Sequence, residues 1–88
     1  MYWKITFYHD QGGETVVIVG PFTSAKKRDD FRKYWRKELM SPEHSRGYYY
    51  SVGFASCNKI GKDDLPLPVK DFKGIPGFFR FTVKRSEN

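Results

Sequence analysis

The alternation of apolar and polar residues over 2–9 is the feature that most restricts how this chain folds. Trp3, Ile5 and Phe7 fall on one side of a two-residue period. The other side carries Tyr2, Lys4, Thr6 and Tyr8. Successive side chains of a β-strand point to opposite faces, so the pattern predicts a strand with one buried face. Such a strand needs a second layer of structure to cover its apolar side.

A second strand is predicted over residues 14–19, where β-branched side chains dominate. It is separated from the first strand by residues 10–13, which end in Gly12 and Gly13. Paired glycines supply positive φ angles at little steric cost, which is typical of a tight turn. The two segments together predict a β-hairpin.

A helix is predicted after Phe22, with Thr23 or Ser24 as its cap and an end near Met40. Pro42 favours that end, because the residue before a proline avoids helical geometry. The predicted buried stripe consists of Phe31, Tyr34, Trp35 and Leu39. The opposite face carries Lys26, Lys33, Arg36 and Lys37, together with Asp29 and Asp30.

Two further strands are expected, over residues 48–57 and 78–84, joined by a long Pro- and Gly-rich connection over 61–77. The fold class expected is therefore α+β, in the order β-β-α-β-β. One amphipathic helix would pack on one face of a four-stranded antiparallel sheet. Because the chain has 88 residues, we expect one domain over 1–88.

Charge and cysteine content restrict the partners and the compartment. The formal net charge is +6 and the pI about 9.6, which favours anionic partners such as nucleic acid or an acidic protein patch. Cys57 is the single cysteine, and no apolar run approaches the roughly twenty residues of a membrane span. We therefore expect a cytoplasmic protein with no membrane partner.

The residue types do not predict an enzyme. His9, His44 and Cys57 have no metal-ligand spacing. Asp63 and Asp64 are adjacent, a pattern typical of a solvated turn rather than of acid–base catalysis. No nucleophile motif or phosphate loop appears. We expect no catalytic residue, no metal and no cofactor.

The predicted helix concentrates positive charge. Residues 24–39 contain seven basic and three acidic side chains, a net charge of +4. Three of the cations lie in the first turn, where the helix dipole disfavours them, and such conflicts often mark functional sites. The predicted nucleic-acid or anion site comprises Lys26, Lys27, Arg28, Lys33, Arg36 and Lys37. The alternative is a solvated face on which Lys26 pairs with Asp30 and Asp29 with Lys33.

A second candidate surface is the sheet face opposite the helix, where rings and cations would alternate. Aromatic rings stack with bases, and Lys or Arg contacts phosphates. This candidate comprises Tyr2, Lys4, Tyr8, Tyr48, Phe78 and Arg80. A dimer interface or a protein-binding face would suit the same residues.

Residues 46–53 include Arg46, Gly47, Tyr48 and Tyr50, which resemble the aromatic RNA-binding strand of the RNA recognition motif. Tyr49, Ser51 and Gly53 depart from that pattern. The family also has a second helix, which residues 58–77 do not predict. The chain is therefore not assigned to it.

The preferred hypothesis is a small non-enzymatic protein that binds DNA or RNA. The alternative is a protein-interaction module that docks on an acidic partner, such as a small regulator or inhibitor of the kind that phages and mobile elements encode. A homodimer joined through sheet edges is a third hypothesis.

Overall fold

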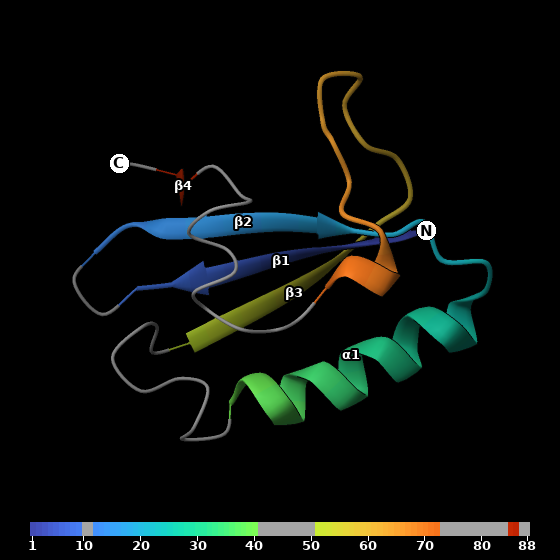
Figure 1. Ribbon diagram of the computed structural model, residues 1–88, viewed down its shortest axis with the longest axis horizontal. Helices are drawn as coiled ribbons and strands as arrows, with labels where there is room; N and C mark the ends of the chain where they lie inside the picture. Colours follow the sequence, from blue (N-terminus) through green and yellow to red (C-terminus); the bar gives the residue numbers. More distant parts are fainter. Residues whose placement is uncertain (10–11, 41–50, 73–84, 87–88) are drawn as a thin grey trace.

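The alternating segment forms the central strand of a sheet in the computed structural model of the chain (Figure 1). The structure describes residues 1–9, 12–40, 51–72 and 85–86. Three antiparallel strands make up the sheet in the order β3-β1-β2, and these are β1 (Tyr2–Tyr8), β2 (Glu14–Val19) and β3 (Ser51–Cys57). A two-residue segment, β4 (Arg85–Ser86), pairs antiparallel with the start of β2. The helix α1 (Ala25–Leu39) makes this an α+β fold within the described ranges.

The register of the strands explains why the sheet has one apolar face. Ile5 lies opposite Val17 on β2 and opposite Phe54 on β3. Trp3, Ile5 and Phe7 are all buried, whereas the residues between them are partly or fully exposed. The predicted hairpin and the predicted buried side of β1 are therefore confirmed.

The helix begins where the sequence places a cap. The Oγ of Ser24 accepts a hydrogen bond from the backbone N–H of Lys27 at 3.2 Å, so Ser24, not Thr23, is the N-cap. Phe31 and Leu39 are buried against the sheet, and Trp35 packs against the same core.

The predicted buried stripe is wrong at Tyr34, which is 59% exposed. Its ring instead meets that of Trp35 edge to face, with centres 5.1 Å apart. One turn of a helix presents only a narrow arc to a flat sheet, and Tyr34 lies outside the arc that Phe31, Trp35 and Leu39 share.

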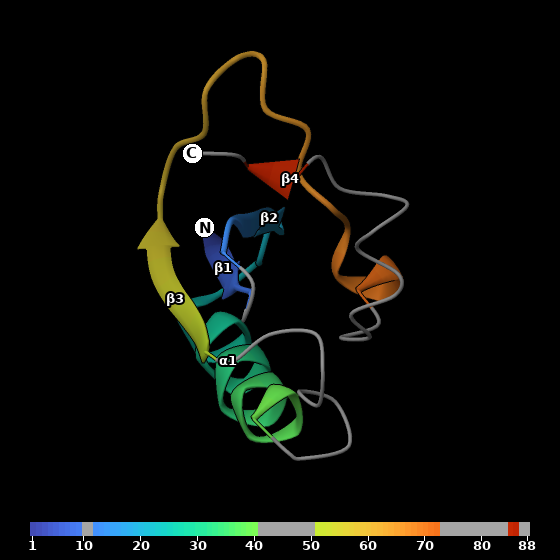
Figure 2. The ribbon, with the colours of Figure 1, turned by 90° about the vertical axis from the view of Figure 1, so that its left-hand side faces the viewer.

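Part of the long connection belongs to the core. The 3₁₀ helix η1 (Val69–Asp71) lies on the same face of the sheet as α1 and leads into Phe72 (Figures 1 and 2). Phe72 is buried, and its ring lies 5.1 Å from Phe31 and 4.9 Å from Trp35. η1 and Phe72 therefore add to the second layer of the fold beside α1.

Of the two further strands expected, one lies within the described residues and one does not. The strand expected over 48–57 is seen as β3, within 51–57. The strand expected over 78–84 lies outside the described residues and stays a prediction. Among the helices described, none has the length and apolarity to cross a bilayer.

Candidate nucleic-acid interface

In the first half of α1, Lys26 and Arg28 pair with carboxylates of the helix itself. The Nζ of Lys26 lies 2.8 Å from Asp30, and the Nε of Arg28 lies 3.2 Å from Asp29. The hydrogen bond with Asp30 and the negative charge of that residue raise the pKa of Lys26 above its ordinary value. This part of the helix follows the solvated-face alternative at Lys26, whereas Asp29 pairs with Arg28 and not with Lys33.

The sequence predicts Arg28 as an anion-binding residue, but in the structure its side chain packs against the core. Its guanidinium carbon lies 5.3 Å from the centre of the Trp3 ring, and its side chain is only 19% exposed. The indole nitrogen of Trp3 donates a 2.7 Å hydrogen bond to the carbonyl of Arg28. At the start of the helix Arg28 is therefore engaged by Asp29 and by the Trp3 ring, whereas Lys27 is exposed.

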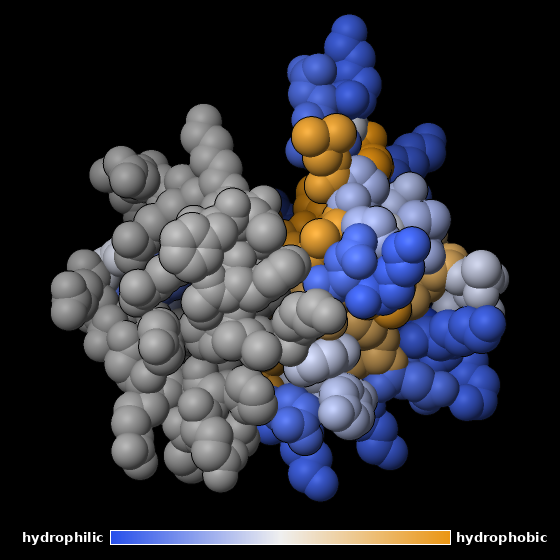
Figure 3. All heavy atoms as spheres, in the orientation of Figure 1, coloured by the Kyte–Doolittle hydropathy of each residue, from blue (hydrophilic) through white to orange (hydrophobic). Residues whose placement is uncertain are grey.

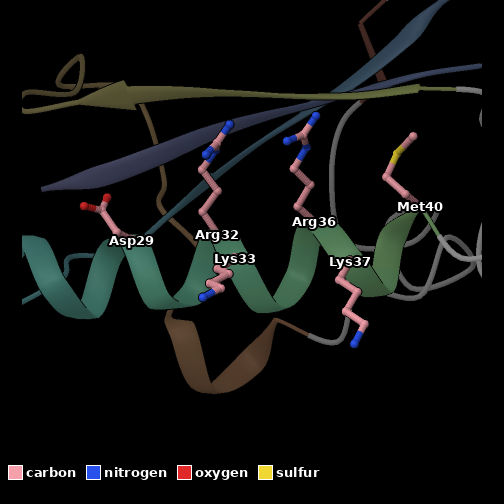
Figure 4. Close-up of a pocket in the computed structure, with 6 residues that line it drawn as sticks. All are labelled: Asp29, Arg32, Lys33, Arg36, Lys37 and Met40. Atoms are coloured by element: carbon pink, nitrogen blue, oxygen red, sulfur yellow. The ribbon is translucent and has the colours of Figure 1, made fainter.

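The second half of α1 brings four cations together. We call Arg32, Lys33, Arg36 and Lys37 the cationic surface; all four are exposed and, with Asp29 and Met40, line one shallow hollow (Figure 4). Arg32 and Arg36 point toward the sheet, whereas Lys33 and Lys37 point away from it (Figure 4). No ion pair within the described ranges engages any of the four.

The cationic surface extends to the C-terminal end of α1, where the helix dipole favours positive charge. Arg36 and Lys37 lie in the last turn of α1, where the carbonyl end of the helix dipole stabilises cations. In Figure 3 hydrophilic residues are visible at the tip of the loop over 58–66, over η1 and along the part of α1 that is not covered by grey atoms. That loop carries Lys59 and Lys62, so it provides cations remote from the hollow.

Aromatic rings lie directly beside the cationic surface. The guanidinium carbon of Arg32 lies 5.7 Å from the ring centre of Trp3 and 5.8 Å from that of Phe54. The two rings meet edge to face with centres 5.8 Å apart. Phe54 is only partly buried, because β3 is the edge strand of the described sheet.

Sequence reasoning missed Arg32 and Phe54 as site residues. The four-residue spacing of Arg28, Arg32 and Arg36 was a signal that could have identified Arg32, because such residues share one helix flank. Phe54 lies within the strand expected over 48–57, and nothing in that pattern marked it as a site residue. Its neighbourhood depends on how α1 crosses β3, which no local pattern reveals.

On the sheet face opposite α1, the structure shows only part of the predicted row of aromatic rings and cations. The ring of Tyr2 packs over Gly20, and that of Tyr8 over Gly53. Among the residues of β1, β2 and β3, Lys4 is the one Lys or Arg, and the register of the strands places it on this face. Tyr48, Phe78 and Arg80 lie outside the described residues, so the row of rings and cations is seen only at Tyr2, Lys4 and Tyr8.

The groups considered for catalysis make local contacts. The Nε2 of His9 shares a 2.7 Å hydrogen bond with the hydroxyl of Thr15. The thiol of Cys57 donates to the carbonyl of Lys59, and Asp64 accepts from the N–H of Gly61. His44 lies outside the described ranges, within which no three His, Cys, Asp or Glu residues are grouped to hold a metal.

Comparison with known proteins adds no relative: no family model matches the chain, and neither does a curated protein or a solved structure.

Proposed function

We propose that this chain is a non-enzymatic binding protein that contacts the phosphate backbone of nucleic acid through the cationic surface. One observation carries the proposal: four exposed cations share a hollow in which the one carboxylate, Asp29, is already paired with Arg28. Polyanions attract such a surface without a deep pocket. The single cysteine accords with action in the cytoplasm.

The geometry suits a repeating anion. Arg32 and Arg36 form one row and Lys33 and Lys37 another, and residues four apart on a helix are separated by about 6 Å along its axis. Each row can therefore contact successive phosphates of a strand. If all four cations do so, log K falls with log salt concentration with a slope of about −3 to −4.

Fluorescence anisotropy with labelled DNA and RNA, single- and double-stranded, at several salt concentrations tests this proposal. The test variant is Lys33→Gln/Arg36→Gln/Lys37→Gln. The matched control is Lys59→Gln/Lys62→Gln/Lys70→Gln, whose three lysines are exposed and outside the hollow. Each variant lowers the formal net charge from +6 to +3.

We expect the test variant to lose most of its affinity, with a salt slope smaller by about 2 to 3. The control should keep most of its affinity. Equal losses would mean that only overall charge matters, and a flat salt response in the wild type would exclude the proposal. Circular dichroism of both variants checks that they fold.

A protein-interaction module is the second candidate, and the position of β3 favours it. An edge strand can accept an extended peptide, and Arg32 and Arg36 would attract acidic side chains on that peptide. Capture of one stoichiometric acidic protein, together with no binding of DNA or RNA, would support this candidate over the first.

A further inference from the structure

Building on the proposed function, we infer that the ligand is single-stranded and that one of its bases stacks on Arg32. The guanidinium carbon of Arg32 lies between 5.7 and 5.8 Å from the ring centres of Trp3 and Phe54. Arg32 as a whole is exposed to solvent. Arg32 is therefore held by two rings and can offer a face to a further planar group.

A base is the planar group that fits this arrangement. Guanidinium planes stack on bases as they do on aromatic side chains, and every base has a face to offer. The edge-to-face contact between Trp3 and Phe54 fixes the rings that support Arg32. Trp3 is buried and hydrogen-bonded to α1, so this support belongs to the rigid core.

The directions of the cations favour a single strand over a duplex. Lys33 and Lys37 point away from the sheet, whereas Arg32 and Arg36 turn toward β3 (Figure 4). A duplex exposes phosphates on its outside and covers both faces of each base by stacking, so it would reach the lysines and leave Arg32 without a base. A single strand along the hollow can place phosphates on Lys33, Arg36 and Lys37 and a base on Arg32.

The end of the hollow adds an apolar contact. Met40 follows α1, is 49% exposed and lines the hollow together with the four cations. A thioether contacts aromatic groups favourably, so Met40 suits a second base. Asp29, at the other end, is neutralised by Arg28 and does not repel the strand strongly.

The test compares a single-stranded oligonucleotide with an abasic oligonucleotide of the same length and with the corresponding duplex, all measured by anisotropy. The abasic strand keeps every phosphate and lacks the bases. The test variant is Arg32→Lys, which keeps the charge and removes the planar group. The control is Lys33→Arg, which also keeps the charge and changes a residue directed away from the rings.

We expect the wild type to bind the normal single strand at least about fivefold more tightly than the abasic strand or the duplex. Arg32→Lys should reduce that preference to less than about twofold, and Lys33→Arg should keep it. Phe54→Leu, which removes one supporting ring, should reduce the preference in the same direction. Because Arg32 is exposed, Arg32→Lys leaves the fold intact even if Phe54→Leu destabilises it.

Two other outcomes are distinguishable. Equal binding of all three ligands, lost in Lys33→Gln/Arg36→Gln/Lys37→Gln, would overturn the stacking inference and leave the proposed function standing. No binding of any oligonucleotide by the wild type would overturn both.

Discussion

The indole nitrogen of Trp3 donates a 2.7 Å hydrogen bond to the backbone carbonyl of Arg28, which joins the start of β1 to the first half of α1. The guanidinium of Arg28 also lies over the face of the Trp3 ring. These two residues lie 25 positions apart in the sequence. Their contact holds the helix on the sheet together with the packing of Phe31, Trp35 and Leu39 in the core.

Trp3→Phe should lower the free energy of unfolding by about 1 to 3 kcal/mol, because it removes the hydrogen bond and part of a buried ring. Urea denaturation followed by circular dichroism measures the loss. Tyr34→Phe, a change at an exposed ring, should stay within about 0.5 kcal/mol of the wild type. Wild-type stability in Trp3→Phe would show that the contact does not hold α1 in place.

Leu39→Ala and Met40→Ala form a matched pair at the end of α1. Leu39 is fully buried and Met40 is 49% exposed. We expect a loss of about 2 to 5 kcal/mol for Leu39→Ala, from lost burial and the cavity left behind. Met40→Ala should cost about 0.5 kcal/mol or less. Similar losses in urea denaturation would contradict the placement of the helix end.

Gly20→Ala should destabilise more than Gly12→Ala. Both glycines have positive φ, +147° at Gly20 and +90° at Gly12. A Cβ at Gly20 would also lie 2.6 Å from the Tyr2 ring and 3.0 Å from the carbonyl of Met1, whereas Gly12 has open space. We expect the two melting temperatures to differ, with Gly20→Ala lower. Addition of Tyr2→Ala should reduce the clash and narrow the difference; an unchanged difference would locate the strain elsewhere.

Ser24→Ala should cost about 0.5 to 2 kcal/mol, because Ser24 caps the N–H of Lys27. Thr23→Ala is the control, since no side-chain cap bond to Thr23 occurs at this helix start. Chemical denaturation of both variants distinguishes them. A larger loss in Thr23→Ala would move the cap by one residue.

Asp30→Asn should lower the pKa of Lys26, because Asp30 raises it through a hydrogen bond and its charge. A lysine whose pKa is raised by folding contributes stability below its ordinary pKa of 10.5, and that contribution disappears as the pH rises through the raised value. Titration of the Lys26 side chain by nuclear magnetic resonance measures the change. Asp63→Asn should leave Lys26 unaffected; an unchanged Lys26 pKa in Asp30→Asn would show that the pair does not form in solution.

The secondary structure of the described ranges was largely predictable. The alternation of Trp3, Ile5 and Phe7 predicted β1 and its buried side, and the cap and the following periodicity predicted a helix from about 24 to 40, close to the observed Ala25–Leu39. These features are local, because the strand and helix periods are properties of a few consecutive residues. The ion pairs of the helix were only partly predictable. The pair of Lys26 with Asp30 was predicted from helical spacing and is observed, whereas Asp29 pairs with Arg28 and not with Lys33.

What the sequence alone determined is therefore the strands β1 and β2, the helix α1, most of β3, the buried side of β1 and the concentration of positive charge on α1. The tertiary structure decided which cations remain exposed, because Trp3 and Asp29 engage Arg28 while Arg32 comes to lie over Trp3 and Phe54. It also brought Phe72 into the core and left Tyr34 outside it. Such contacts join residues far apart in the chain, and their geometry exists only once the helix has packed on the sheet.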